Sequence, residues 1–106
     1  MIKNLTPEEI KEILLYKENA RLIDVREEWE HKIARIDNSE LMPLSNFSEF
    51  LPKLNPEEMI ILYCHHGTRS YTVASYLYRN GFKNVINMEG GIDAWSEAVD
   101  DKIPQY

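Results

Sequence analysis

The stretch MIILYCHHGTRS, residues 59–70, decides how this chain folds. Its first five residues form a short apolar run, which is typical of a strand buried on both faces of a parallel sheet. Gly67 allows a sharp turn of the backbone, and the residues from Thr68 onward predict the start of a helix. The stretch therefore predicts a strand, a tight loop and a helix, with Cys64 at the carboxyl end of the strand.

The sequence on either side alternates between strand and helix patterns. Thr6, Pro7 and Glu9 have the spacing of a capping box with proline at the first helical position, so a helix is expected over residues 7–18. Further helices are expected at residues 27–32, 46–54, 69–80 and 92–99, and further strands at residues 22–25, 36–44 and 84–88. This alternation predicts an α/β fold with a parallel sheet.

The composition limits the size of the fold and the classes of partner. The chain has 106 residues, the length of one domain, so a single domain over residues 1–106 is expected. The net charge of −6 argues against direct nucleic-acid binding, and every apolar run is much shorter than the ~20 residues of a membrane span, so neither partner is expected. The one cysteine cannot form an internal disulfide, which favours a reducing compartment such as the cytoplasm.

Cys64 lies where ligands bind in open α/β sheets, at the carboxyl end of a strand. A loop that curls into a helix N-terminus turns backbone N–H groups toward its centre, and such a cradle favours a thiolate over a thiol. Arg69 can supply a nearby cation, and Thr68 or Ser70 can cap the helix or donate a hydroxyl. The alternative interpretation is that Cys64 is a small buried apolar residue that ends its strand.

Three motifs, in order, resemble the single-domain rhodanese-like sulfurtransferases. They are LIDVRE at residues 22–27, the loop YCHHGTRS at residues 63–70 and EGGIDAW at residues 89–95. The resemblance implies a rhodanese-like α/β fold, in which a central parallel sheet of five strands is flanked by helices on both faces and residues 2–5 form the first strand. It also implies that Cys64 is the catalytic nucleophile of a sulfurtransferase. The residues of the implied persulfide-binding loop are His65, His66, Gly67, Thr68 and Arg69.

The resemblance implies a relay of sulfur between other molecules. Cys64 is expected to take sulfane sulfur from thiosulfate or from a persulfide on a protein or small molecule. Because the chain has no second cysteine, the sulfur must leave to an external thiol, which a protein could carry, or to cyanide in an assay. Asp24 and Arg26 are expected to pair and to support the loop together with Ser70, with substrate contact by Arg26 as the alternative. No metal and no cofactor is expected.

Two other functions remain open from the sequence. The rhodanese-like fold also serves as a non-catalytic protein-binding module, which a missing cysteine or a broken loop would favour. Related phosphatases and arsenate reductases have five residues between cysteine and arginine, whereas four separate Cys64 from Arg69. His65 and His66 occupy positions where related thiosulfate users often carry a permanent cation, so affinity for thiosulfate is expected to weaken as pH rises from about 6 to 8. The alternative is that both histidines are exposed loop residues without a specific role.

Overall fold

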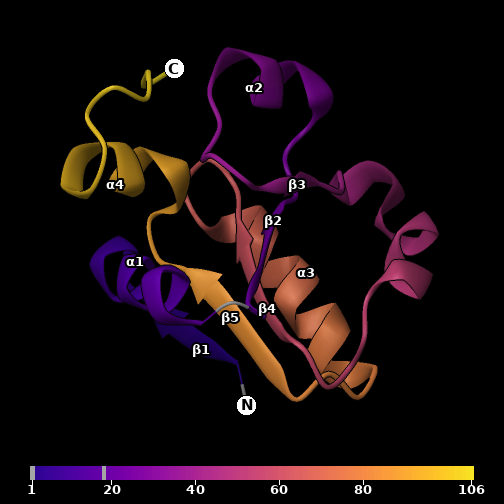
Figure 1. Cartoon of the computed structure of the whole chain (residues 1–106). Helices are drawn as coiled ribbons and strands as arrows, with labels where there is room; N and C mark the ends of the chain where they lie inside the picture. Colours follow the sequence, from indigo (N-terminus) through magenta and orange to yellow (C-terminus); the bar gives the residue numbers. More distant parts are fainter. Residues whose placement is uncertain (1, 18) are drawn as a thin grey trace.

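The five strands lie in one parallel sheet, in an order that differs from their order along the chain (Figure 1). The computed structural model describes residues 2–17 and 19–106. From one edge to the other, the strands are β1 (Lys3–Leu5), β5 (Asn84–Met88), β4 (Met59–Tyr63), β2 (Arg21–Asp24) and β3 (Glu40–Leu41). Every neighbouring pair is parallel, which confirms the predicted sheet. β4 is therefore central, and Cys64 follows at its carboxyl end.

Helices cover both faces of the sheet, as the resemblance implied (Figure 1). The helices are α1 (Pro7–Tyr16), α2 (Glu28–Ile33), α3 (Thr68–Arg79) and α4 (Gly91–Ala98), with the 3₁₀ helices η1 (Leu44–Glu49) and η2 (Leu51–Lys53). Ile61 and Tyr63 of β4 pack into the apolar cluster shared with α1 and α4. Ile60 and Leu62 point to the opposite face and pack into the cluster shared with α3 and η1. Both faces of β4 are thus buried, as its unbroken apolar run predicted.

The capping box at the start of α1 is confirmed. Thr6 Oγ1 accepts the backbone N–H of Glu9 at 3.3 Å, and the Glu9 carboxylate accepts the backbone N–H of Thr6 at 2.9 Å. The helix ends at Tyr16, whereas residues 7–18 were predicted. Glu18, the last residue of that prediction, lies outside the described residues.

Two predicted elements take a different form between β2 and β4. The strand expected over residues 36–44 is reduced to the two residues of β3, because residues 37 and 38 form a turn in which Asn38 has a φ of +67°. The helix expected over residues 46–54 is replaced by η1 and η2, since Asn46 has non-helical backbone angles and Pro52 lies in the first turn of η2. This segment is therefore helical only in short 3₁₀ pieces.

The amino end of α4 is held against the loop that follows β4. The N–H of Ile92 donates to the carbonyl of Cys64 at 2.9 Å, and the N–H of Asp93 donates to the carbonyl of His65 at 3.2 Å. Gly91 makes this approach possible, because it has a φ of +63° and a Cβ there would collide with these two carbonyl oxygens. The loop around Cys64 is therefore positioned by α4 as well as by β4.

We expect Gly91→Ala to lower the free energy of unfolding by more than Gly81→Ala does. Both glycines have a positive φ, +63° and +87°, so alanine at either position adds roughly 1–2 kcal/mol of backbone strain. At Gly91 a Cβ also meets backbone carbonyl oxygens, whereas at Gly81 it meets no described atom within 4 Å. Urea denaturation of both variants measures the difference. Equal losses would contradict the close packing of α4 on the Cys64 loop.

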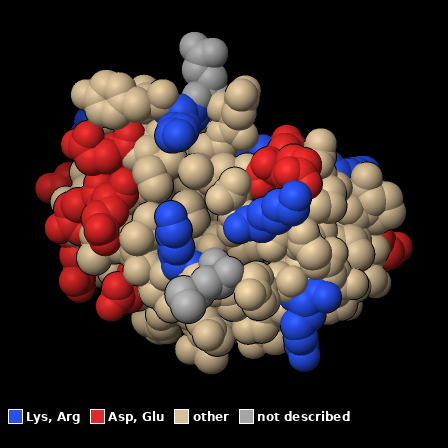
Figure 2. Space-filling view, turned by 90° about the horizontal axis from the view of Figure 1, so that it is seen from below, with Lys and Arg blue, Asp and Glu red and all other residues tan. Residues whose placement is uncertain are grey.

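Charged side chains are distributed unevenly over the surface. Figure 2 shows the molecule from below, with a group of Asp and Glu side chains on one side and Lys and Arg side chains that stand apart from one another. This distribution fits the excess of 18 acidic over 12 basic residues. None of the helices in the described ranges is long and apolar enough to cross a membrane.

Candidate active site

The sulfur of Cys64 is the hydrogen-bond acceptor at the amino end of α3. Gly67 is the N-cap residue of this helix, with a φ of +103° and no side chain to accept a hydrogen bond. Sγ of Cys64 takes that role, because it accepts the backbone N–H of Gly67 at 3.1 Å and the backbone N–H of Ser70 at 3.3 Å. Cys64, and not Thr68 or Ser70, therefore caps the helix. The two N–H groups and the positive end of the helix dipole stabilise negative charge on the sulfur.

The hydroxyl of Ser70 lies between Cys64 and the amide of Asn87. It donates to Oδ1 of Asn87 at 2.5 Å and lies 3.4 Å from Sγ of Cys64. Nδ2 of Asn87 donates to Asn4 and to the carbonyl of Gly67, and these bonds fix the orientation of the amide. Because a hydroxyl has one proton, it donates to only one of these two acceptors at a time, and the bond to Asn87 is the shorter. The backbone N–H groups of Gly67 and Ser70 donate to the sulfur whichever way this hydroxyl points.

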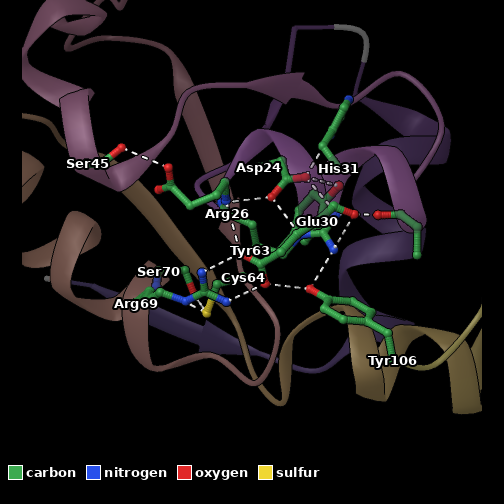
Figure 3. Close-up of polar contacts among 12 residues, drawn as sticks. Asp24, Arg26, Glu30, His31, Ser45, Tyr63, Cys64, Arg69, Ser70 and Tyr106 are labelled. Carbon is green, nitrogen blue, oxygen red and sulfur yellow. Dashed lines mark hydrogen bonds and ion pairs between the residues drawn. The ribbon is translucent and has the colours of Figure 1, made fainter.

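Arg69 is held by a carboxylate that the sequence did not single out (Figure 3). Its Nη1 and Nη2 donate to Oε1 and Oε2 of Glu30 at 2.6 and 2.8 Å, and the hydroxyl of Tyr106 donates to Oε2 at 2.7 Å. Burial alone would raise the pKa of Glu30, but hydrogen bonds, above all from Arg69, lower the pKa from 4.5 to about 2. Glu30 therefore stays ionised and fixes the guanidinium of Arg69 beside the Cys64 loop.

Asp24 and Arg26 pair in the interior, and both side chains are 0% exposed. Nε and Nη2 of Arg26 donate to the two carboxylate oxygens of Asp24 at 2.9 and 2.7 Å. Nδ1 of His31 lies 2.8 Å from the same carboxylate, and Nη1 of Arg26 donates to the hydroxyl of Tyr106 at 2.8 Å. Burial disfavours the charged guanidinium, yet the bonds to Asp24 raise the pKa of Arg26. Arg26 is enclosed by these partners, so its guanidinium belongs to a buried network of polar contacts.

The rings of His65 and His66 form a stack with Tyr106 beside Cys64. The ring of His65 lies 3.9 Å from each neighbour between centroids, at 5° to Tyr106 and 23° to His66. Burial, and then the neighbouring His66, lower the pKa of His65, so its ring is mainly uncharged near neutral pH. Possible metal-ligand atoms of His65, His66 and Asp93 lie within 4.8 Å of one another. The sequence pointed to no metal ligands here.

Comparison with known proteins identifies this arrangement. The model of the rhodanese-like domain matches residues 6–98. The chain belongs to the rhodanese-like domain family. This rhodanese-like chain is 34% identical over 90 residues to the thiosulfate sulfurtransferase GlpE of Pseudoalteromonas translucida (strain TAC 125), a match that covers 85% of this chain and 86% of that protein.

A second rhodanese-like relative is considerably longer. The rhodanese-like/PpiC domain-containing protein 12, chloroplastic, of Arabidopsis thaliana is 39% identical over 112 residues, and the match covers 99% of this chain but 38% of that protein. The crystal structure of a rhodanese-like domain protein from Staphylococcus aureus has a TM-score of 0.84 at 32% identity and covers 98% of each chain. The structural similarity confirms the rhodanese-like fold predicted from the three motifs.

Four residues at the rhodanese-like site were not predicted from the sequence. Glu30 and Arg69 are 39 positions apart, and Tyr106 is 76 positions from Glu30, so no local spacing could indicate their contacts. Asn87 lies in β5 and Asp93 in α4, and each reaches the loop only through the fold. The one local signal is the position of Glu30 three residues after the N-cap of α2, which indicates a helix start and not a partner for arginine.

We expect the contribution of Glu30 to the free energy of unfolding to be lost at acid pH. Its pKa is lower in the folded protein than the ordinary 4.5, so the contribution is complete above that pH and is lost as pH falls toward about 2. Glu30→Gln keeps the size of the side chain and removes its charge. The difference in free energy of unfolding between wild type and Glu30→Gln should be constant above pH 4.5 and should shrink below it, as measured by urea denaturation across pH.

Glu49→Gln provides the matched control, because Glu49 is exposed and belongs to η1, outside this network. It should change the free energy of unfolding little at any pH. A difference for Glu30→Gln that is the same in acid and at neutral pH would contradict the ionised contact with Arg69.

Proposed function

We propose that this protein is a sulfurtransferase that carries sulfane sulfur as a persulfide on Cys64. The observation that carries the proposal is the position of Sγ, which accepts two backbone N–H groups at the amino end of α3. An inert cysteine at the end of a strand has no need of such donors, whereas a thiolate and a persulfide are both anions that they stabilise. The similarity to a thiosulfate sulfurtransferase supports the same function.

The first half-reaction forms the persulfide. The thiolate of Cys64 attacks the outer sulfur of thiosulfate, a new S–S bond forms, and the S–S bond of thiosulfate breaks. Sulfite leaves with the electron pair of the broken bond, so the charge of −3 on the reactants is retained in the persulfide anion and sulfite. A persulfide donor reacts in the same way and leaves as a thiolate. The N–H groups of Gly67 and Ser70 then hold the anionic product.

The second half-reaction returns the cysteine to its starting state. An external thiolate or cyanide attacks the outer sulfur, and Cys64 leaves as a thiolate. Because the chain contains one cysteine, it cannot resolve the persulfide as an internal disulfide, and the acceptor is necessarily another molecule. The reaction is therefore a relay with two separate substrates.

The electrostatics of the loop bear on the choice of donor. The charge of Arg69 is balanced by the bidentate contact with Glu30, and His65 is mainly uncharged near neutral pH. A small dianion is therefore attracted less strongly than it would be by a free guanidinium and a permanent cation. We expect a persulfide on a protein or small molecule to be the natural donor, with thiosulfate as its substitute in an assay.

Incubation with thiosulfate should add the mass of one sulfur atom to the wild-type protein, detectable by mass spectrometry of the intact chain. The added sulfur should be removed by cyanide with formation of thiocyanate. Cys64→Ser should show neither the added mass nor thiocyanate formation, because serine lacks the nucleophilic sulfur. Absence of the adduct from the wild type would contradict the proposal and favour a non-catalytic binding module.

The same variant controls for oxidation. Two oxygen atoms on methionine have nearly the mass of one sulfur, and all 4 methionines remain in Cys64→Ser. An adduct that persists in this variant, or that cyanide does not remove, is oxidation and not a persulfide.

We expect the KM for thiosulfate to rise with pH through a contribution from the loop histidines. The pKa of His65 is lowered by burial and by His66, so its ring gains a proton only below histidine's usual value of about 6.5. The proton attracts the dianionic donor, so affinity is highest in acid and weakens as pH rises. The sequence predicted that affinity for thiosulfate weakens between about pH 6 and 8. For the contribution of His65, the weakening is now expected at lower pH.

The matched measurement is the ratio of KM values for wild type and His65→Ala/His66→Ala at each pH, because pH effects that do not involve these two histidines cancel in the ratio. The KM values of the two proteins should become more nearly equal as pH rises. A ratio that is independent of pH would contradict a role for histidine charge in binding the donor.

A further inference from the structure

Three potential metal ligands lie close together beside the Cys64 loop, and none of them forms or breaks a bond in the sulfur relay described above. His65 and His66 follow Cys64, and Asp93 lies in the first turn of α4. Their ligand atoms lie within 4.8 Å of one another, and Nε2 of His66 is 3.8 Å from Oδ2 of Asp93. This separation exceeds a hydrogen bond, so the pair leaves room between the nitrogen and the oxygen.

The backbone holds the two parts of this cluster together. The N–H of Asp93 donates to the carbonyl of His65 at 3.2 Å, and the N–H of Ile92 donates to the carbonyl of Cys64 at 2.9 Å. Gly91 permits this contact because any larger residue would place a Cβ against both carbonyl oxygens. The positions from which the three side chains extend are therefore fixed by the fold before any ion binds.

Outer residues also orient the three side chains. The ring of Tyr106 stacks on His65, and His65 stacks on His66, with 3.9 Å between centroids in each pair. Nε2 of Gln105 donates to Oδ1 of Asp93 at 3.1 Å, which leaves Oδ2 directed toward His66. Metal-binding carboxylates characteristically have hydrogen-bonded outer partners such as Gln105, and these partners raise affinity by fixing ligand orientation.

The ligand set fits a divalent first-row metal, and Zn²⁺ in particular. Two imidazoles and one carboxylate are a common three-ligand set for Zn²⁺, which then keeps its fourth position open. Two ligand atoms bound 2.0–2.1 Å from a tetrahedral ion are roughly 3.4 Å apart, close to the 3.8 Å between Nε2 of His66 and Oδ2 of Asp93.

We propose that His65, His66 and Asp93 form a binding site for a divalent metal ion, best suited to Zn²⁺, beside the Cys64 loop. His66 and Asp93 have partly exposed side chains, with 64% and 33% of their surface accessible, so they can close around an ion without disturbing the core. A bound dication would place two positive charges where an anionic sulfur donor approaches. The binding itself involves no redox step and does not depend on the sulfurtransferase proposal.

Isothermal titration of Zn²⁺ into the untagged, reduced, chelator-treated full chain tests the site. The wild type should bind one Zn²⁺ per chain. His66→Ala and Asp93→Asn should each weaken binding strongly, and Gln105→Ala should weaken it by about 10–100-fold, as expected for an outer partner. Asp101→Asn is the matched control, because Asp101 is an exposed carboxylate outside the cluster, and it should bind Zn²⁺ as the wild type does.

Cys64→Ser separates this site from simple binding by the thiol. The variant should retain Zn²⁺ binding, and Co²⁺ bound to the wild type should show d–d absorption without a thiolate-to-cobalt charge-transfer band. Loss of binding in Cys64→Ser, wild-type affinity in folded Asp93→Asn, or no Zn²⁺ binding by the wild type would each overturn the proposal. Circular dichroism of each variant shows that it is folded, so a weakened affinity reports on the ligands.

Discussion

The hydrogen bonds that Sγ of Cys64 accepts from the backbone at the start of α3 set the geometry of the whole site. A helix leaves its first N–H groups without internal partners, and Gly67 has no side chain to satisfy them. The sulfur satisfies two of these groups, so the loop from Cys64 to Ser70 must wind tightly enough to bring the end of β4 under the start of α3. The positive φ of Gly67 and the close approach of Gly91 both follow from this winding. The same bonds that complete the helix also stabilise an anionic sulfur.

Glu30 links the loop to the rest of the carboxyl edge of the sheet. Its carboxylate accepts from Arg69 in α3 and from Tyr106, whose hydroxyl in turn accepts from Arg26 (Figure 3). Arg26 continues the network to Asp24 at the end of β2. An ionised group in such a setting is stable only with all its partners in place, since removing one leaves a buried charge uncompensated. The ion pairs therefore fix the orientation of Arg69 and the position of the Tyr106 ring that stacks on His65.

The features that could be predicted from the sequence are those with a local physical cause. The apolar run of β4 has the predicted bounds of Met59–Tyr63, because burial on two faces selects unbroken apolar residues. β5 also has its predicted bounds, residues 84–88, although it contains two asparagines. The strand over residues 36–44 was predicted too long because residues 37 and 38 form a turn, and the helix near Pro52 was predicted too long because proline lacks the N–H of a regular helix.

The polar partners of the candidate site could not be predicted in this way. The contact of Glu30 with Arg69 and that of Asp93 with the loop join residues far apart in sequence, and their side chains have no characteristic spacing. The sequence prediction had to assume the ordinary pKa of histidine for His65. Burial in the stack lowers this pKa, and the stack forms only in the folded chain. Cys64 itself could be singled out because its strand, loop and helix are contiguous.

If Cys64 carries one transferable sulfur, the stoichiometry of a single turnover measures it. The protein is loaded with a sulfur donor, freed of excess donor by gel filtration, and mixed with cyanide in the absence of any other sulfur source. One thiocyanate should be released per chain in a single rapid phase, with recovery of one free thiol. Release of no thiocyanate from the loaded, folded protein would contradict it.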